Sequence, residues 1–308
     1  ALQFLIHNCK IERFDLMPTQ YILLPLSAYF DRFGDHLTNE QVHELQRWVY
    51  MALIWSRYSS AAESAVDQDV NALNSQQSLR ALIQNIEDKV GRRPVSEREL
   101  RDQRKNSPYM LMAYVLARQA EAQDWFNGVV IGSTQSLELH HIFPKDTLKE
   151  RYNLKADSRT IDQVANLAFL SGRANARIQA HPPSEYLASI DPIRLKAQSV
   201  PVDVGLWTVD RFEDFLLARR TLLADAINHL LQSLTEGPAL WTVSEVEVLK
   251  TRVEVLERQL RSLTSRRLVE AWGEYAWDRG IPSNIRGNLD QRIKNHIANA
   301  PYEAKKYE

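Results

Sequence analysis

Hydrophobic residues in the stretch 18–74 recur at spacings of three and four, which is the pattern of amphipathic helices. The clearest series follows Thr38, which forms a capping-box pattern with Gln41. Its apolar positions lie on one stripe: Val42, Leu45, Trp48, Val49, Ala52 and Trp55. A second capping-box pattern, Ser60 with Glu63, predicts the start of another helix. We expect the apolar stripe to face the core of an N-terminal helical region.

A run of mixed charge follows the break at residues 91–94, whose sequence is GRRP. Its charged residues are Arg98, Arg101 and Arg104 beside Glu97, Glu99 and Asp102. Runs of this kind are most often a solvated helix face. We therefore expect them to face solvent rather than to bind a ligand, and the helical pattern resumes at 107–122.

Strand-forming residues are concentrated in the middle of the chain. Residues 125–132 (WFNGVVIG) and 135–144 (QSLELHHIFP) are rich in β-branched and aromatic residues, and LAFL at 167–170 is a third short candidate. Ser171 has the position of an N-cap for a helix that stops at the two prolines after His181. The order strand, loop, strand, helix predicts a small α+β unit inside a mainly α protein.

The remaining chain is helical again. Apolar residues recur at helical spacing from Phe212 to Leu231, and a second series does so within 246–263. The second series covers little more than two heptads, so a helical hairpin within the chain is favoured over pairing with another chain. A homodimer through residues 246–263 is the alternative.

Composition narrows the class of protein. Of the 308 residues, 44% are apolar and 25% are charged, as in a folded globular chain. Cys9 is the single cysteine, which excludes an intramolecular disulfide or a Cys-rich zinc site and favours a reducing, cytoplasmic location. No apolar stretch approaches the roughly 20 residues of a membrane span. The net charge is −1, so any contact with nucleic acid must come from a local basic patch.

His140 and His141 are the residues with the clearest chemistry. Neighbouring side chains of a regular strand point to opposite faces, so both can serve one site only where the strand ends or bulges, and Pro144 favours an ending there. One imidazole can bind a divalent metal together with the side-chain oxygen of Asn175 from the following helix. The other can act as a general base, because much of the imidazole is neutral at pH 7. Such a pair suits the hydrolysis of a phosphodiester.

The histidine pair alone leaves a structural alternative open, in which one histidine is buried and hydrogen-bonded and the other is exposed. Asn166 and Asn175 are then unrelated helix caps. The sequence HHIFP, the two asparagines and the order of the elements together favour the metal and base assignment.

The segments LELHHIFPKD and VANLAFLSGRANARI resemble the HNH, or ββα-metal finger, endonucleases. By this resemblance, His140 and Asn175 are the metal ligands, His141 is the general base, and Asn166 fixes the loop between the strands. Many relatives have Asp at the position of His140. Because this ligand is neutral and softer, Mg²⁺ is not strictly required, and we expect Mg²⁺ or Mn²⁺, with Ni²⁺ and Co²⁺ as further options.

A wider resemblance covers most of the chain and points to the C-terminal half of two-part restriction and phage-defence proteins that cut modified or foreign DNA. In those proteins a ParB-like, nucleotide-dependent domain precedes the nuclease half. This chain begins ALQF without an initiator Met, so we expect it to be a piece of a longer protein and that domain to be its partner. The predicted fold is mainly α with an embedded ββα finger. It has an N-terminal helical domain at 1–106, the HNH nuclease domain at 107–205, and a helical region at 206–308 that buttresses the finger.

The predicted function is a metal-dependent DNA endonuclease that nicks duplex DNA and leaves 5′-phosphate and 3′-hydroxyl ends. Lys145, Arg173 and Arg177 are candidates for contact with DNA phosphates. A non-catalytic DNA-binding or sensing module of a defence complex is the main alternative, and RNA cleavage is a third interpretation. We expect His181 to cap the finger helix rather than to contact DNA.

Overall fold

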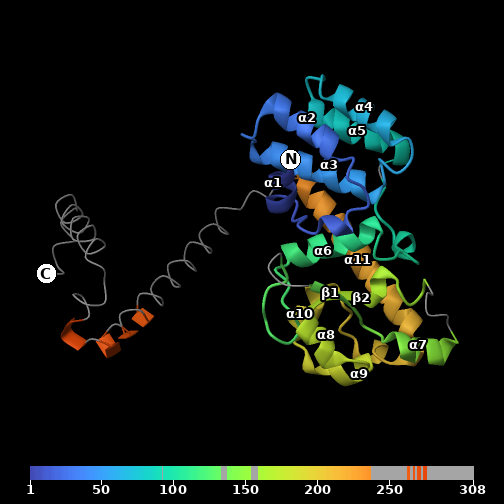
Figure 1. Ribbon diagram of the computed structural model, residues 1–308, viewed down its shortest axis with the longest axis vertical. Coiled ribbons are helices and arrows are strands. Elements are labelled where there is room, and N and C mark those ends of the chain that lie inside the picture. The colour runs from blue at the N-terminus through green and yellow to red at the C-terminus, as the bar shows by residue number, and fades with distance from the viewer. Residues whose placement is uncertain are drawn as a thin grey trace. The chain divides into compact units, whose positions relative to one another are not determined.

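The computed structural model describes residues 1–91, 93–132, 137–153 and 159–236, together with a few residues between 262 and 275. Residues Ala1–Pro238 form one compact unit and Ala239–Glu308 a second. The described part of the first unit is mostly helical and contains a two-stranded antiparallel sheet (Figure 1), which confirms the predicted fold class. None of the described helices is long and apolar enough to cross a membrane. The domain boundaries after residues 106 and 205 stay predictions, and residues 246–261 of the C-terminal series lie outside the described residues.

The N-terminal helices are α1 (Leu2–His7), α2 (Leu23–Phe33), α3 (Asn39–Ile54), α4 (Ala62–Ala72) and α5 (Ser78–Val90). The capping box at the start of α3 is confirmed, because the Thr38 hydroxyl accepts a hydrogen bond from the Gln41 N–H and the Gln41 side chain accepts one from the Thr38 N–H. The second predicted capping box is wrong. The chain turns at Ala61, which has a left-handed conformation and is the N-cap of α4 without a side-chain cap, so Ser60 lies before the helix.

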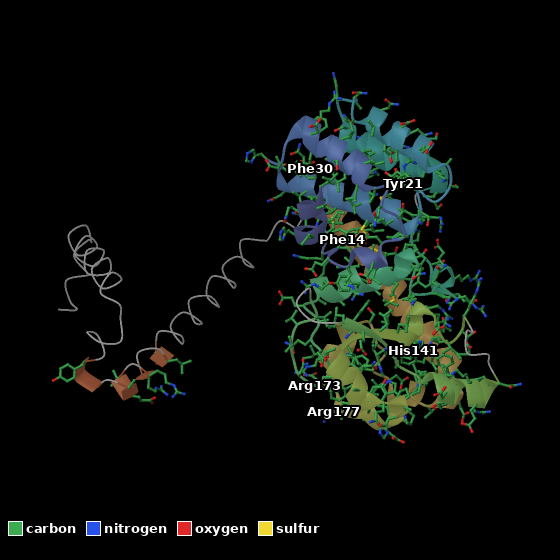
Figure 2. All side chains as sticks on the ribbon, viewed as in Figure 1. Phe14, Tyr21, Phe30, His141, Arg173 and Arg177 are labelled. Atoms are coloured by element: carbon green, nitrogen blue, oxygen red, sulfur yellow. The ribbon has the colours of Figure 1, made fainter. Side chains whose placement is uncertain are left out.

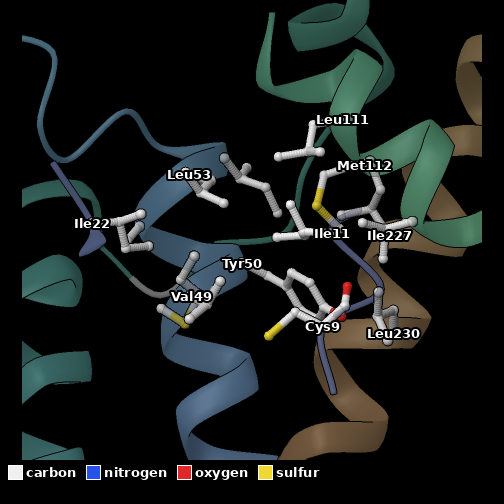
Figure 3. Packing of buried hydrophobic residues seen from close by; sticks show 14 of the residues in the cluster. Cys9, Ile11, Ile22, Val49, Tyr50, Leu53, Leu111, Met112, Ile227 and Leu230 are labelled. Carbon is white, nitrogen blue, oxygen red and sulfur yellow. The ribbon is translucent and has the colours of Figure 1, made fainter. Parts of the chain in front are cut away.

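The larger hydrophobic cluster is built around α3. Side chains from α3 meet those from α6 (Pro108–Gln119) and α11 (Phe212–Glu236), together with Cys9 and Ile11 from the N-terminal segment (Figure 3). Trp48 is fully buried in this cluster, whereas Trp55 is partly buried and packs against it. The predicted apolar stripe therefore faces the core.

The strands and short helices follow α6 along the chain: β1 (Leu137–His141), α7 (Lys145–Tyr152), β2 (Leu167–Ser171), α8 (Gly172–Ile178), α9 (Pro183–Tyr186) and α10 (Pro192–Lys196). β1 and β2 pair antiparallel, with His140 opposite Ala168 and His141 opposite Leu167. The Ser171 hydroxyl caps α8 by accepting a hydrogen bond from the backbone of Ala174. The chain thus follows the predicted order of strand, loop, strand and helix, with α7 inside the loop.

Residues 125–132, which the sequence predicts as a strand, form turns instead. An isolated bridge joins Gln123 to Val130, and no strand is assigned to the described residues 125–132. The buried carboxylate of Asp124 accepts hydrogen bonds from the backbone N–H groups of the second and third residues after it, and from the N–H of Ser171. This local capping competes with the extended backbone of a strand.

Helix α11 contributes to both hydrophobic clusters of the unit. Its early residues Phe212 and Phe215 pack on Phe143, with ring centroids 5.0 and 4.9 Å apart, in the second cluster. Its later residues belong to the cluster around α3. Between these two regions, the buried guanidinium of Arg219 donates a hydrogen bond of 3.1 Å to the carbonyl of Ala165. The segment before β2 is therefore anchored to α11.

Candidate active site

The two histidines at the end of β1 point to different surroundings. His140 is 3% exposed and faces α8, whereas His141 is partly exposed and faces the segment before β2. The strand ends at His141, and Pro144 is the residue before α7. The pair thus lies where the sequence predicts the strand to end.

His140 meets Asn175 between β1 and α8. The Nδ1 atom of His140 lies 2.8 Å from Oδ1 of Asn175, and the amide nitrogen of Asn175 donates a 2.6 Å hydrogen bond to the carboxylate of Glu138. This second hydrogen bond orients the amide, because its nitrogen must face the carboxylate and its oxygen then faces His140. An imidazole nitrogen and an amide oxygen, both able to bind a cation, therefore converge on one point.

The second ring nitrogen of His140 reaches Tyr186. Nε2 lies 3.1 Å from the Tyr186 hydroxyl, which also lies 2.9 Å from the carbonyl of Ile142. Oδ1 of Asn175 can only accept, so Nδ1 carries the proton in the free neutral ring. A metal at Nδ1 would shift this proton to Nε2, where the Tyr186 oxygen can accept it while its hydroxyl donates to Ile142. Burial lowers the pKa of His140 to about 4, so the ring is neutral at pH 7. A neutral imidazole with a free Nδ1 is the form that binds a metal.

Glu138 adds a carboxylate on the same face of β1 as His140, two residues away. A Cβ at Gly172 would lie 2.7 Å from Oε1 of Glu138, so the glycine at the start of α8 makes room for this carboxylate. The nitrogen of His140 and the oxygens of Asn175 and Glu138 fit a divalent cation that accepts mixed ligands. No group of three His, Cys, Asp or Glu side chains suited to a metal occurs among the described residues. A cation held here would therefore also need oxygens from water or a phosphate.

His141 is oriented by a carboxylate from the segment before β2. Its Nε2 lies 2.9 Å from Oδ1 of Asp162, and the same carboxylate pairs with Lys145 at 2.7 Å and with Arg104 at 3.4 Å. An acceptor at Nε2 favours the tautomer protonated there, which leaves Nδ1 free to take up a proton. Burial lowers the pKa of His141, and the hydrogen bond to Asp162 opposes this effect. Although burial alone raises the pKa of Asp162, its hydrogen bonds with Lys145 and His141 keep that pKa below the ordinary value.

Asn166 joins the loop after β1 to the segment before β2. The side chain is fully buried, and its oxygen accepts a 2.9 Å hydrogen bond from the N–H of Phe143. Its amide nitrogen donates to the carbonyls of Phe143 and Ile161 at 3.2 and 2.9 Å. All three hydrogen bonds go to the backbone, so they support a role in positioning the loop that follows the histidines.

A family model described as GmrSD restriction endonucleases, C-terminal domain, matches residues 68–225, just over half of the chain. The chain belongs to this family. The matched range contains His140, His141, Asn166 and Asn175, and it confirms the predicted membership of the nuclease half of restriction proteins. No curated protein and no solved structure matches the chain.

The GmrSD C-terminal domain carries the three candidate phosphate-contact residues on different elements. Lys145 is the first residue of α7 and forms an ion pair with Asp162, the same carboxylate that contacts His141. Arg173 and Arg177 are exposed on α8, the helix that carries Asn175 (Figure 2). The structure therefore groups Lys145 with His141, and it groups the two arginines with the helix of the candidate metal ligand.

The sequence alone does not predict two residues of the candidate site, Asp162 and Tyr186. Asp162 lies 21 residues from the histidine that it contacts, and Tyr186 lies 46 residues from His140. Asp162 precedes Asn166 by four residues and Tyr186 follows a pair of prolines, but neither spacing is specific to a catalytic site. Only the folded chain brings them to the histidines.

Proposed function

We propose that this GmrSD C-terminal domain is a metal-dependent DNA endonuclease of the HNH type. The observation that carries the proposal is the arrangement at the end of β1, where His140 and Asn175 converge on one side and Asp162 holds His141 on the other. Membership of a restriction endonuclease family supports DNA as the substrate. His140 and Asn175, with Glu138 beside them, would hold a divalent metal that neutralises charge on the phosphate.

The chain's own residues have separate roles in the proposed hydrolysis. His141 accepts a proton at Nδ1 from the water that attacks phosphorus, while Asp162 keeps Nε2 protonated and the ring in place. The bond from phosphorus to the 3′ oxygen breaks, and the 3′ oxygen takes up a proton from solvent, which leaves a 3′-hydroxyl and a 5′-phosphate. Asn166 holds the loop after the histidines in position through its three backbone hydrogen bonds.

We further infer that the domain acts in the cytoplasm, nicks one strand at a time and takes its DNA selectivity from a partner domain. The resemblance of the chain implies an upstream ParB-like, nucleotide-dependent domain, which is the proposed source of recognition. One histidine pair serves one phosphodiester at a time. Dimerisation through residues 246–263 is the alternative that would allow both strands to be cut.

Incubation of supercoiled plasmid with the chain and a divalent metal should produce nicked circles. We expect Mn²⁺, Ni²⁺ or Co²⁺ to support nicking at least as well as Mg²⁺, because the imidazole of His140 binds later transition metals better than hard Mg²⁺. Gel electrophoresis over a series of metal concentrations measures both results.

Three outcomes of this experiment would count against parts of the proposal. Activity with Mg²⁺ alone would contradict the metal preference and favour a larger share for Glu138 in binding the metal. DNA binding without cleavage in every metal would favour a non-catalytic binding module. Cleavage of an RNA substrate without cleavage of the plasmid would contradict DNA as the substrate.

The variant Tyr186→Phe should bind Mn²⁺ about tenfold more weakly than the parent chain, because Nε2–H of His140 loses its acceptor. Asn175→Ala removes a proposed ligand and should weaken binding at least as much, and excess metal should partly restore its nicking. Isothermal titration calorimetry with the full chain measures the affinities. Tyr152→Phe is a matched control, since the Tyr152 hydroxyl donates to the Val209 carbonyl and does not contact His140. Equal affinity of the Tyr186→Phe variant and the parent would show that this hydroxyl does not position the ligand.

A further inference from the structure

A cleft of about 500 Å³ opens beside His141. Its lining residues are Arg104, Lys105, Asn106, Leu139, His141, Lys145, Asp162 and Leu167. The strands and α7 provide four of these eight residues. Arg104 belongs to the mixed-charge run that the sequence predicts to face solvent, and Lys105 and Asn106 follow it directly. This part of the run therefore lies next to the proposed general base.

The wall formed by residues 104–106 is held in place by backbone contacts. The N–H of Val164 donates a 2.7 Å hydrogen bond to the carbonyl of Gln103, and Arg104 forms an antiparallel bridge with Gln163. The buried guanidinium of Arg220 then contacts the side chains of Gln163 and Glu97 at 3.1 and 3.2 Å. The segment that precedes α6 is thus fastened both to the segment before β2 and to α11.

The cleft carries an excess of positive charge in a chain whose net charge is −1. Arg104, Lys105 and Lys145 line it with one carboxylate, that of Asp162. Arg104 and Lys145 both pair with Asp162, at 3.4 and 2.7 Å. Lys105 is exposed and makes no ion pair within the described part of the chain. One carboxylate cannot neutralise three cations, so the cleft favours an anionic ligand.

We propose that this cleft binds the sugar–phosphate backbone of DNA next to the scissile phosphate, with Lys105 and Arg104 as phosphate contacts. This inference rests on the proposed function, because it is His141 that places the scissile bond at the mouth of the cleft. Lys and Arg side chains supply most of the salt-dependent affinity of proteins for DNA, and such contacts position the duplex without reading its sequence. Residues before position 107 then take part in holding the substrate.

The test compares Lys105→Gln with the parent chain in binding a short DNA duplex, measured by fluorescence anisotropy without metal at several salt concentrations. We expect binding to weaken several-fold at low salt, and the slope of log K against log salt to decrease by about 0.9, which corresponds to one phosphate contact. Lys89→Gln is the matched control, because Lys89 is an exposed lysine on α5 that does not line the cleft. It should bind with the parental affinity and slope.

Parental affinity and slope for Lys105→Gln, with an unchanged thermal unfolding curve, would overturn the proposal. So would an effect of Lys105→Gln on an RNA duplex without an effect on DNA. The plasmid assay tests the proposed nuclease function independently of this binding experiment. If the parent nicks plasmid but Lys105→Gln does not change DNA binding, only the proposed role of the cleft is contradicted. If Lys105→Gln weakens DNA binding but the parent does not nick plasmid, the nuclease function is contradicted and the role of the cleft is supported.

Discussion

Replacing His141 with alanine should slow plasmid nicking by about two to four orders of magnitude, the usual effect of removing a positioned general base. The variant loses the Nδ1 atom that we propose accepts the proton of water, but it keeps His140, Asn175 and Glu138. Metal affinity and DNA binding should therefore stay close to those of the parent. Single-turnover cleavage at saturating metal, with metal binding measured by calorimetry, tests both expectations.

An exposed histidine three residues after the end of α8 provides a matched control. His181 lies 2.9 Å from the carboxylate of Glu185 and contacts neither His140 nor His141. His181→Ala should nick at the parental rate. If His141→Ala nicked DNA as fast as the parent while its metal was bound, His141 would not be the base, and the structural interpretation of the histidine pair would be the better one.

The same assignment sets the direction of the pH dependence. Only neutral imidazole accepts a proton, so nicking should rise with pH as His141 loses its proton. Burial lowers the pKa of His141 from its ordinary value of 6.5, despite the opposing hydrogen bond to Asp162. The rise should therefore be centred below pH 6.5 and be complete near neutral pH.

The variant Asn166→Ala should lower the free energy of unfolding by about 3 kcal/mol or more, because it leaves buried backbone groups without partners at about 1–3 kcal/mol each. These groups are the N–H and carbonyl of Phe143 and the carbonyl of Ile161. Urea denaturation followed by circular dichroism measures the loss. Asn127→Ala is a matched control, since the Asn127 side chain is exposed and accepts one hydrogen bond from the backbone of Val129. A loss below about 1 kcal/mol for Asn166→Ala would mean that these hydrogen bonds do not hold the loop.

The sequence predicts those parts of the site that depend on local order. His140 and Asn175 come together because a strand ending at His141 pairs with the strand that leads directly into α8. Asp162 could not be found in this way, because its contact with His141 depends on a loop that includes α7. Tyr186 reaches His140 from the last position of α9, the short helix that follows α8.

The errors about the fold have a similar physical cause. Residues 125–132 have the composition of a strand, but the carboxylate of Asp124 caps the backbone that follows it, and this side-chain effect outweighs the β propensity of the segment. Ser60 and Glu63 have the spacing of a capping box, but the left-handed conformation of Ala61 starts the helix one residue later. A single spacing pattern does not reveal such competing local interactions.

Helix α11 must accompany the strands and α8 if the candidate active site is to be transferred to another protein. Phe143, two residues after His141, packs against Phe212 and Phe215 of that helix. Arg219 of the same helix donates a hydrogen bond to the carbonyl of Ala165, the residue before Asn166. A graft that carried only the two strands and α8 into another scaffold would leave these groups facing water. Recombination that exchanges nuclease modules among defence proteins should therefore preserve function only when its downstream junction falls after α11.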